Sequence, residues 1–147
     1  MDQKSGAASL VISEELILKF SRAIAKEEGY YVPNSVPQRA HNPGDLTDEG
    51  DVGFGFIQTQ GPHGAKITIY ANDDDGWRAL YRKVRRMLSG ASHTYTLDMT
   101  VMEVALKYSG DPTWARNVAA ALGINTTTTL QQIAQADLRA QGEAQEA

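Results

Sequence analysis

An acidic side chain stands where an apolar helical pattern stops. Glu28 directly precedes Gly29, and the aromatic pair Tyr30 and Tyr31 follows. Unpaired carbonyl groups at the end of a helix disfavour the ionised form of a nearby carboxylate, and aromatic neighbours add desolvation. A carboxyl group that keeps its proton near neutral pH is what general acid catalysis requires. Glu28 is therefore a candidate general acid, with Tyr30 and Tyr31 beside it as candidate binding residues.

The adjacent Glu27 is the competing candidate. A helix turns about 100° per residue, which places Glu27 inside the apolar stripe and Glu28 at its edge. An acid at the edge of a buried face can meet a cleft without entering the core. The pattern therefore favours Glu28, for which the alternative interpretation is a solvated charge at a helix end.

Amide and turn-forming residues gather in the segment that follows, from Tyr30 to Gly53, which is predicted to be irregular. Irregular segments of this length are uncommon in compact domains and tend to be functional. Its candidate binding residues are Gln38 and Asn42, although Asn42 could equally brace the loop. Asp45 adds a second carboxylate, which is either catalytic or an ordinary turn aspartate after Pro-Gly.

Six further elements are predicted around these residues. Ser13 caps a helix that ends at Glu28, and Gly53–Thr59 pairs with Lys66–Tyr70 as a β-hairpin. Four helices follow, starting at Asn72 or Asp73, at about Leu97, at Asp111-Pro112 and at Thr129, with the last ending near Arg139. The predicted fold class is α+β and predominantly helical, with a small hairpin between the first helix and a helical bundle.

Composition excludes several functions. The 147 residues carry a formal net charge of -4, which argues against nucleic-acid binding, and they contain no cysteine. No apolar run is long enough to span a membrane, and no signal peptide is visible at the start. His41, His63 and His93 lack the spacing of a zinc site, so no metal or cofactor is expected.

Several segments together resemble a known family. Glu28-Gly29, the run Arg39-Ala40-His41-Asn42-Pro43-Gly44-Asp45, and Tyr70 with Gly76-Trp77-Arg78-Ala79-Leu80 are similar to a bacterial and bacteriophage family of the lysozyme-like superfamily. Members of that family are described as virion structural proteins or as peptidoglycan-degrading enzymes. This chain differs from the family pattern at Ala40, His41 and Asp45, where asparagines are usual.

The resemblance implies a lysozyme-like fold and a peptidoglycan glycosidase, a muramidase or lytic transglycosylase that cleaves the β-1,4 bond between N-acetylmuramic acid and N-acetylglucosamine. Glu28 would be the general acid. Asp45 could activate water, giving inversion if the carboxyl groups stand roughly 6.5–9.5 Å apart. Otherwise the 6-hydroxyl group of the sugar could attack. The alternative is a non-catalytic glycan-binding or virion structural protein.

Two more residues join the candidate site. Gln58 ends Gly55-Phe56-Ile57-Gln58, which is loosely similar to the Gly-Leu-Met-Gln motif of bacterial transglycosylases. Tyr70 could stack on a sugar ring, or belong to the core. The expected partner is peptidoglycan or another N-acetylglucosamine-containing polymer, at the cell wall or periplasm. We expect a monomer with a flexible segment 1–12, one domain over 13–139 and a frayed tail over 140–147.

Overall fold

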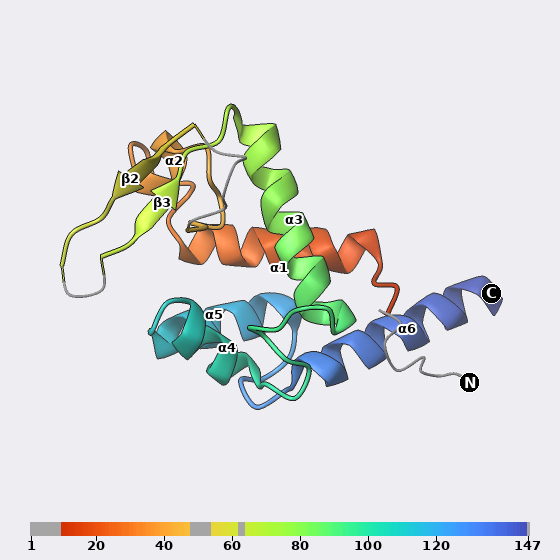
Figure 1. Ribbon diagram of the computed structural model, residues 1–147. Helices are drawn as coiled ribbons and strands as arrows, with labels where there is room; N and C mark the ends of the chain where they lie inside the picture. Colours follow the sequence, from red (N-terminus) through yellow and green to blue (C-terminus); the bar gives the residue numbers. More distant parts are fainter. Residues whose placement is uncertain (1–9, 48–53, 62–63, 147) are drawn as a thin grey trace. The chain divides into compact units, whose positions relative to one another are not determined.

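The computed structural model describes residues 10–47, 54–61 and 64–146. Helices dominate these residues, and a two-stranded antiparallel sheet accompanies them (Figure 1). The prediction of an α+β chain in which helix predominates is confirmed at this level. The chain divides into two compact units, one formed by residues 21–82 and the other by the parts up to residue 20 and from residue 83. Residues 1–9 of the predicted flexible segment lie outside the described residues.

Helix α1 (Glu14–Glu27) matches the predicted first helix. The Ser13 hydroxyl group accepts a hydrogen bond from the Leu16 N–H at 3.2 Å, which satisfies one of the free donors of the first turn. Gly29 ends the helix with a φ of 85°, in the left-handed region that glycine enters without steric penalty. Glu28 directly follows the helix, and its N–H still donates to the Ile24 carbonyl at 2.9 Å.

The segment after α1 is more regular than predicted, because it contains the short helix α2 (Val36–Arg39). Ser35 caps α2 by accepting a hydrogen bond from the Gln38 N–H at 3.3 Å, and Pro37 occupies its first turn. Proline is favoured there because its fixed φ suits a helix and the missing N–H is not needed. Local capping thus orders part of a stretch whose composition indicates only loop.

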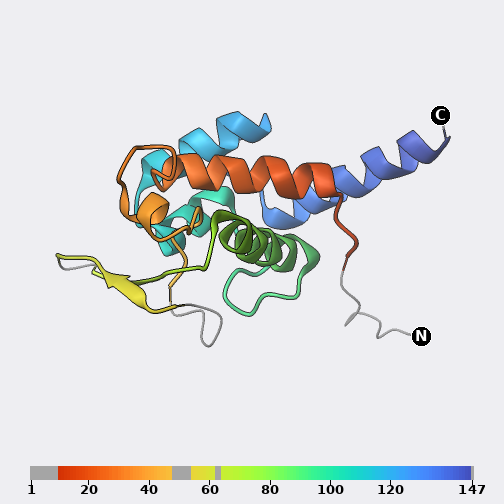
Figure 2. The ribbon, with the colours of Figure 1, turned by 90° about the horizontal axis from the view of Figure 1, so that it is seen from above.

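The hairpin is confirmed by strands β2 (Phe56–Gln58) and β3 (Lys66–Thr68), which pair antiparallel with Ile57 opposite Ile67. The two strands lie side by side in both views (Figure 1 and Figure 2). Residues 62–63 of the predicted turn lie outside the described residues. On its other side, β3 forms an isolated bridge between Ile67 and Thr47.

Helix α3 (Asp73–Ser89) begins as predicted, because the Asn72 side chain accepts a hydrogen bond from the Asp75 N–H at 2.9 Å. Its first turn lies against the backbone of the turn at residues 41–43. A Cβ atom added to Gly76 would stand 1.9 Å from the His41 carbonyl oxygen and 3.0 Å from Pro43 Cδ. Only glycine permits this approach of a helix to a neighbouring backbone.

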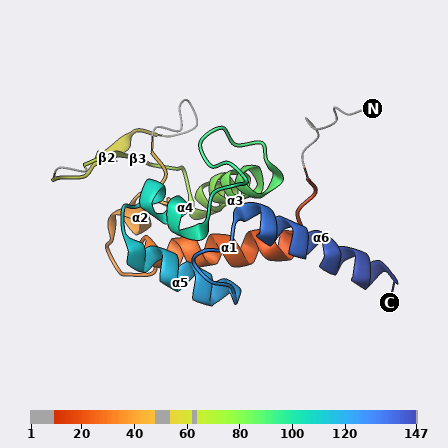
Figure 3. The same cartoon turned by 90° about the horizontal axis from the view of Figure 1, so that it is seen from below.

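In the other unit, α4 (Val101–Tyr108) and α5 (Pro112–Leu122) pack side by side (Figure 3). The predicted start of α4 at about Leu97 is wrong. Thr100 and Glu103 form a reciprocal capping box that fixes the first turn at Val101. The predicted limits of α5 are confirmed by the Asp111 cap and by Gly123, whose φ is 71°.

Helix α6 (Leu130–Glu146) starts at the predicted cap, where Thr129 and Gln132 exchange hydrogen bonds. Its predicted end near Arg139 is wrong, since the helix continues through most of the segment expected to fray. Alanine, glutamine and glutamate dominate this segment and are strong helix formers. The Gln141 amide group also donates to Asp137 at 2.8 Å and to the Val11 carbonyl at 3.1 Å. No helix in the described ranges is both long and apolar enough for a membrane span.

Gly76→Ala tests the close approach of α3 to the turn. Alanine normally stabilises a helix interior by about 1 kcal/mol relative to glycine. Here the added methyl group would displace the His41 carbonyl, and we expect a loss of about 2–3 kcal/mol in the free energy of unfolding. Gly142→Ala in α6 is the matched control, because a Cβ atom there meets nothing within 4 Å. Chemical denaturation should give opposite signs for the two variants, and equal stabilisation would contradict the close contact.

Candidate functional site

Asn42 fixes the turn that carries Asp45. Its side chain is fully buried, and its amide group donates to the carbonyl oxygens of Leu46 and Thr68, both at 2.8 Å. Its amide oxygen accepts a hydrogen bond from the Leu46 N–H at 2.8 Å. All of these bonds lie inside the fold, so Asn42 braces the loop, which was one of the two roles expected for it. Its buried amide group is not available to bind a sugar.

The turn brings together the two predicted catalytic carboxyl groups. The side chains of Glu28 and Asp45 form a hydrogen bond. Burial raises the pKa of Asp45 to about 6, and the hydrogen bond with Glu28 acts in the opposite direction. The Oδ1 atom of Asp45 is buried and makes no hydrogen bond within the described part of the chain. Asp45 also has a φ of 53°, an uncommon conformation for a residue other than glycine.

Two carboxyl groups can form a hydrogen bond only when at least one of them carries a proton. The bond lowers the pKa of Asp45, which is the effect expected when Glu28 donates and the Asp45 carboxylate accepts. The arrangement can therefore hold a proton in a partly desolvated place at pH values where isolated carboxyl groups are ionised. That is the property sought in a general acid.

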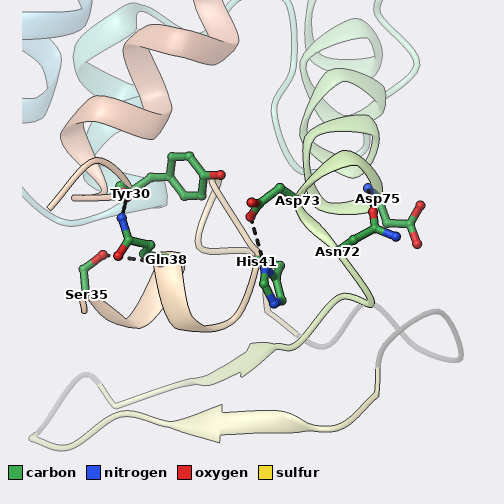
Figure 4. A network of polar contacts seen from close by, with 7 residues as sticks. All are labelled: Tyr30, Ser35, Gln38, His41, Asn72, Asp73 and Asp75. Carbon is green, nitrogen blue, oxygen red and sulfur yellow. Dashed lines mark hydrogen bonds and ion pairs between the residues drawn. The ribbon is translucent and has the colours of Figure 1, made fainter. Parts of the chain in front are cut away.

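A second polar network joins the segment after α1, the turn at residues 41–43 and α3. The Asp73 carboxylate accepts a hydrogen bond from Tyr30 and lies 3.1 Å from Nδ1 of His41 (Figure 4). Trp77 donates a hydrogen bond to the Tyr30 hydroxyl group, and the rings of these two residues meet edge to face at 5.5 Å. Burial raises the pKa of Tyr30, and the hydrogen bond and charge of Asp73 raise it further.

Sequence reasoning missed this network. It included Tyr30, but it interpreted Asp73 only as a candidate cap of α3 and Trp77 only as part of an apolar face and of the segment Gly76–Leu80. The available signal was that His41 lies in the segment 39–45 and Trp77 in the segment 76–80, the two segments on which the expected resemblance was based. Their juxtaposition depends on the contact between α3 and the turn, which no local pattern predicts.

The remaining predicted residues are dispersed over the unit formed by residues 21–82. The Gln38 side chain donates to the Tyr30 carbonyl at 3.4 Å (Figure 4). It also accepts a hydrogen bond from the Asn34 N–H at 2.9 Å, so it braces the loop. Gln58 donates to backbone carbonyls of the hairpin. Tyr31 is 55% exposed and lies edge-on to Tyr30 at 5.3 Å, so it is accessible to a ligand.

Tyr70 is only 3% exposed, in keeping with its alternative interpretation as a core residue, and it is one of the residues that line a pocket. Among the described residues, no cluster of three or more histidine, aspartate or glutamate side chains is arranged to hold a metal ion.

Comparison with known protein families, with curated proteins and with solved structures finds no match to this chain. The described residues define an α-rich protein with a small antiparallel sheet and a hydrogen-bonded pair of carboxyl groups.

Asp45→Asn tests the state of the carboxyl pair. A raised pKa means that the folded state binds this proton more tightly than the unfolded chain does. The associated stability is present below pH 3.8 and is lost as the pH rises through about 6. The shift from 3.8 to about 6 corresponds to at most about 3 kcal/mol. Relative to Asp45→Asn, the wild type should therefore lose stability between these pH values.

Denaturant unfolding measured across that range provides the comparison. Glu143→Gln, on the exposed surface of α6, is the control and should follow the wild type. Parallel stability curves for the wild type and Asp45→Asn would contradict the raised pKa of Asp45.

Asp73→Asn tests the second network. Removing the charge should lower the pKa of Tyr30, because the neutral amide no longer opposes ionisation of the hydroxyl group. NMR titration of tyrosine ring carbons measures this directly. Asp74→Asn is the control, since Asp74 raises the pKa of Tyr81 and not that of Tyr30. Unchanged titration of Tyr30 in Asp73→Asn would exclude the hydrogen bond.

Proposed function

We propose that this chain is a glycosidase of peptidoglycan or a related N-acetylglucosamine-containing polymer, built on a lysozyme-like scaffold, with Glu28 as the general acid. The hydrogen bond between Glu28 and Asp45 is the observation that supports it most. Cleavage of a glycosidic bond needs a proton for the leaving oxygen, and two hydrogen-bonded carboxyl groups must share at least one proton.

The roles of the two carboxyl groups differ. Glu28 directly follows α1 and is partly exposed, so it can present its proton to a bound sugar. Asp45 is desolvated on one oxygen and accepts the hydrogen bond that orients the Glu28 carboxyl group. When Glu28 releases its proton, two negative charges would face each other, and this repulsion favours recapture of a proton for the next turnover.

The contact between the carboxyl groups also bears on the reaction route. An inverting hydrolase needs roughly 6.5–9.5 Å between its carboxyl groups to accommodate the attacking water. A hydrogen-bonded pair leaves no such space. The geometry therefore favours attack by the 6-hydroxyl group of the muramic acid residue itself, which gives a 1,6-anhydro product. Exposed Tyr31 and the partly exposed Tyr30 beside it would offer apolar ring faces to the sugar.

Glu28→Gln should reduce cleavage of purified cell walls by at least about a hundredfold, because loss of a general acid typically has effects of that order. Its melting temperature should stay close to the wild-type value, since the glutamine amide can still donate to Asp45. Glu27→Gln, one residue earlier in α1, is the matched control and should retain cleavage. The readouts are turbidity loss and mass spectrometry of the released fragments.

The mass of the fragments separates the reaction routes, because hydrolysis adds water and internal attack does not. Full activity in Glu28→Gln would refute the assignment of the acid. Sedimentation of the protein with cell walls but no cleavage by the wild type would instead favour the non-catalytic alternative.

A further inference from the structure

A pocket of about 230 Å³ opens on α3, within the unit formed by residues 21–82. It is lined by Tyr70, Asp75, Arg78, Ala79 and Arg82. Complete ligands usually fill sites of roughly 300–1,000 Å³. This pocket is smaller, so its size suits one substituent of a larger ligand rather than a whole sugar chain.

The charges in the pocket favour an anion. Arg78 is paired with Asp75 across one helical turn, at 3.2 Å, so these two charges largely offset each other. Arg82 follows Arg78 by four residues on the same side of the helix, and none of the described residues forms an ion pair with it. One positive charge is thus left over, and a guanidinium group matches the planar geometry of a carboxylate.

The apolar lining restricts what can carry that anion. The buried residues Tyr70 and Ala79 line the same pocket as the two arginines. A short carbon substituent that ends in a carboxylate would contact Tyr70 and Ala79 with its carbon atoms and the arginines with its charge. Free inorganic anions would use only the arginines.

The pocket wall is connected to the turn that carries the acid pair. The Tyr70 N–H donates to the Ala40 carbonyl at 2.9 Å, and Thr68, two residues earlier, accepts a hydrogen bond from Asn42. The strand end that supplies Tyr70 and the turn that supplies Asp45 are therefore parts of one hydrogen-bonded substructure. A sugar polymer bound at the acid pair is longer than one unit, so a neighbouring unit of the same polymer is the group that we consider for the pocket.

We propose that this pocket binds a carboxylate group of the glycan substrate, with Arg82 as the main cation, and that it makes the protein prefer acidic muramic-acid chains over neutral N-acetylglucosamine chains. The inference rests on the proposed function, whose substrate it specifies. The carboxylate has two sources in such a polymer. It is the lactyl group of muramic acid where no peptide is attached, and the stem peptide where one is.

Three oligosaccharides of equal length test the inference. The first alternates N-acetylglucosamine and muramic acid without peptides, the second carries stem peptides, and the third contains N-acetylglucosamine alone. The measured quantity is kcat/KM for each acidic substrate divided by kcat/KM for the neutral one. We expect Arg82→Gln to lower this ratio about tenfold, as for loss of one charge-assisted contact. Arg82→Lys should retain part of it, and Arg139→Gln on exposed α6 should match the wild type.

A fall confined to the first or the second substrate supports the proposal and identifies the source of the carboxylate. An unchanged ratio in Arg82→Gln overturns the proposal while leaving the glycosidase assignment intact. If the folded wild type cleaves none of the three, the glycosidase assignment fails, and binding of the oligosaccharides then tests the pocket by itself. The Arg82 Nε–H resonance in NMR spectra should then shift with the acidic oligosaccharides only, and the absence of any shift would overturn the proposal.

Discussion

The buried amide group of Asn42 is the interaction on which the candidate site depends. It binds two carbonyl groups and one N–H group that belong to separate parts of the chain, the turn near Leu46 and the strand end at Thr68. An aliphatic side chain of similar size would leave these groups buried without partners, at about 1–3 kcal/mol each. The turn would then lose its fixed shape, and with it the position of Asp45 relative to Glu28.

A steric constraint works together with this polar one. Gly76 lets the first turn of α3 rest directly on the His41 carbonyl, and the Asp73 carboxylate of the same turn reaches the His41 side chain. The segments 39–45 and 76–80 therefore form a single packed substructure. Each segment alone is a common turn or an ordinary helix. The steric contact at Gly76 and the contact between Asp73 and His41 hold the two segments against each other.

Local signals made much of the fold predictable. Ser13, Asp111 and Thr129 cap helices through bonds to residues two or three positions away, and such short-range chemistry can be read from sequence order. The start of α4 was misplaced because the apolar pattern begins before the capping box at Thr100. The choice of Glu28 and Asp45 as paired acids came from residue type and resemblance, whereas their hydrogen bond depends on the long-range bonds of Asn42. The Asp73 network and the pocket beside Arg82 likewise arise from tertiary contacts, which periodicity does not encode.

Asp45 itself gives an argument about function. Its backbone is in the left-handed conformation, which asparagine adopts at least as readily as aspartate. An asparagine there would not ionise, whereas burial raises the pKa of the aspartate to about 6. Near neutral pH the carboxylate therefore opposes folding, so stability does not account for its presence. Residues that break a local preference without a structural gain concentrate at functional sites, and the Asp45 carboxylate has Glu28 as the group on which it acts.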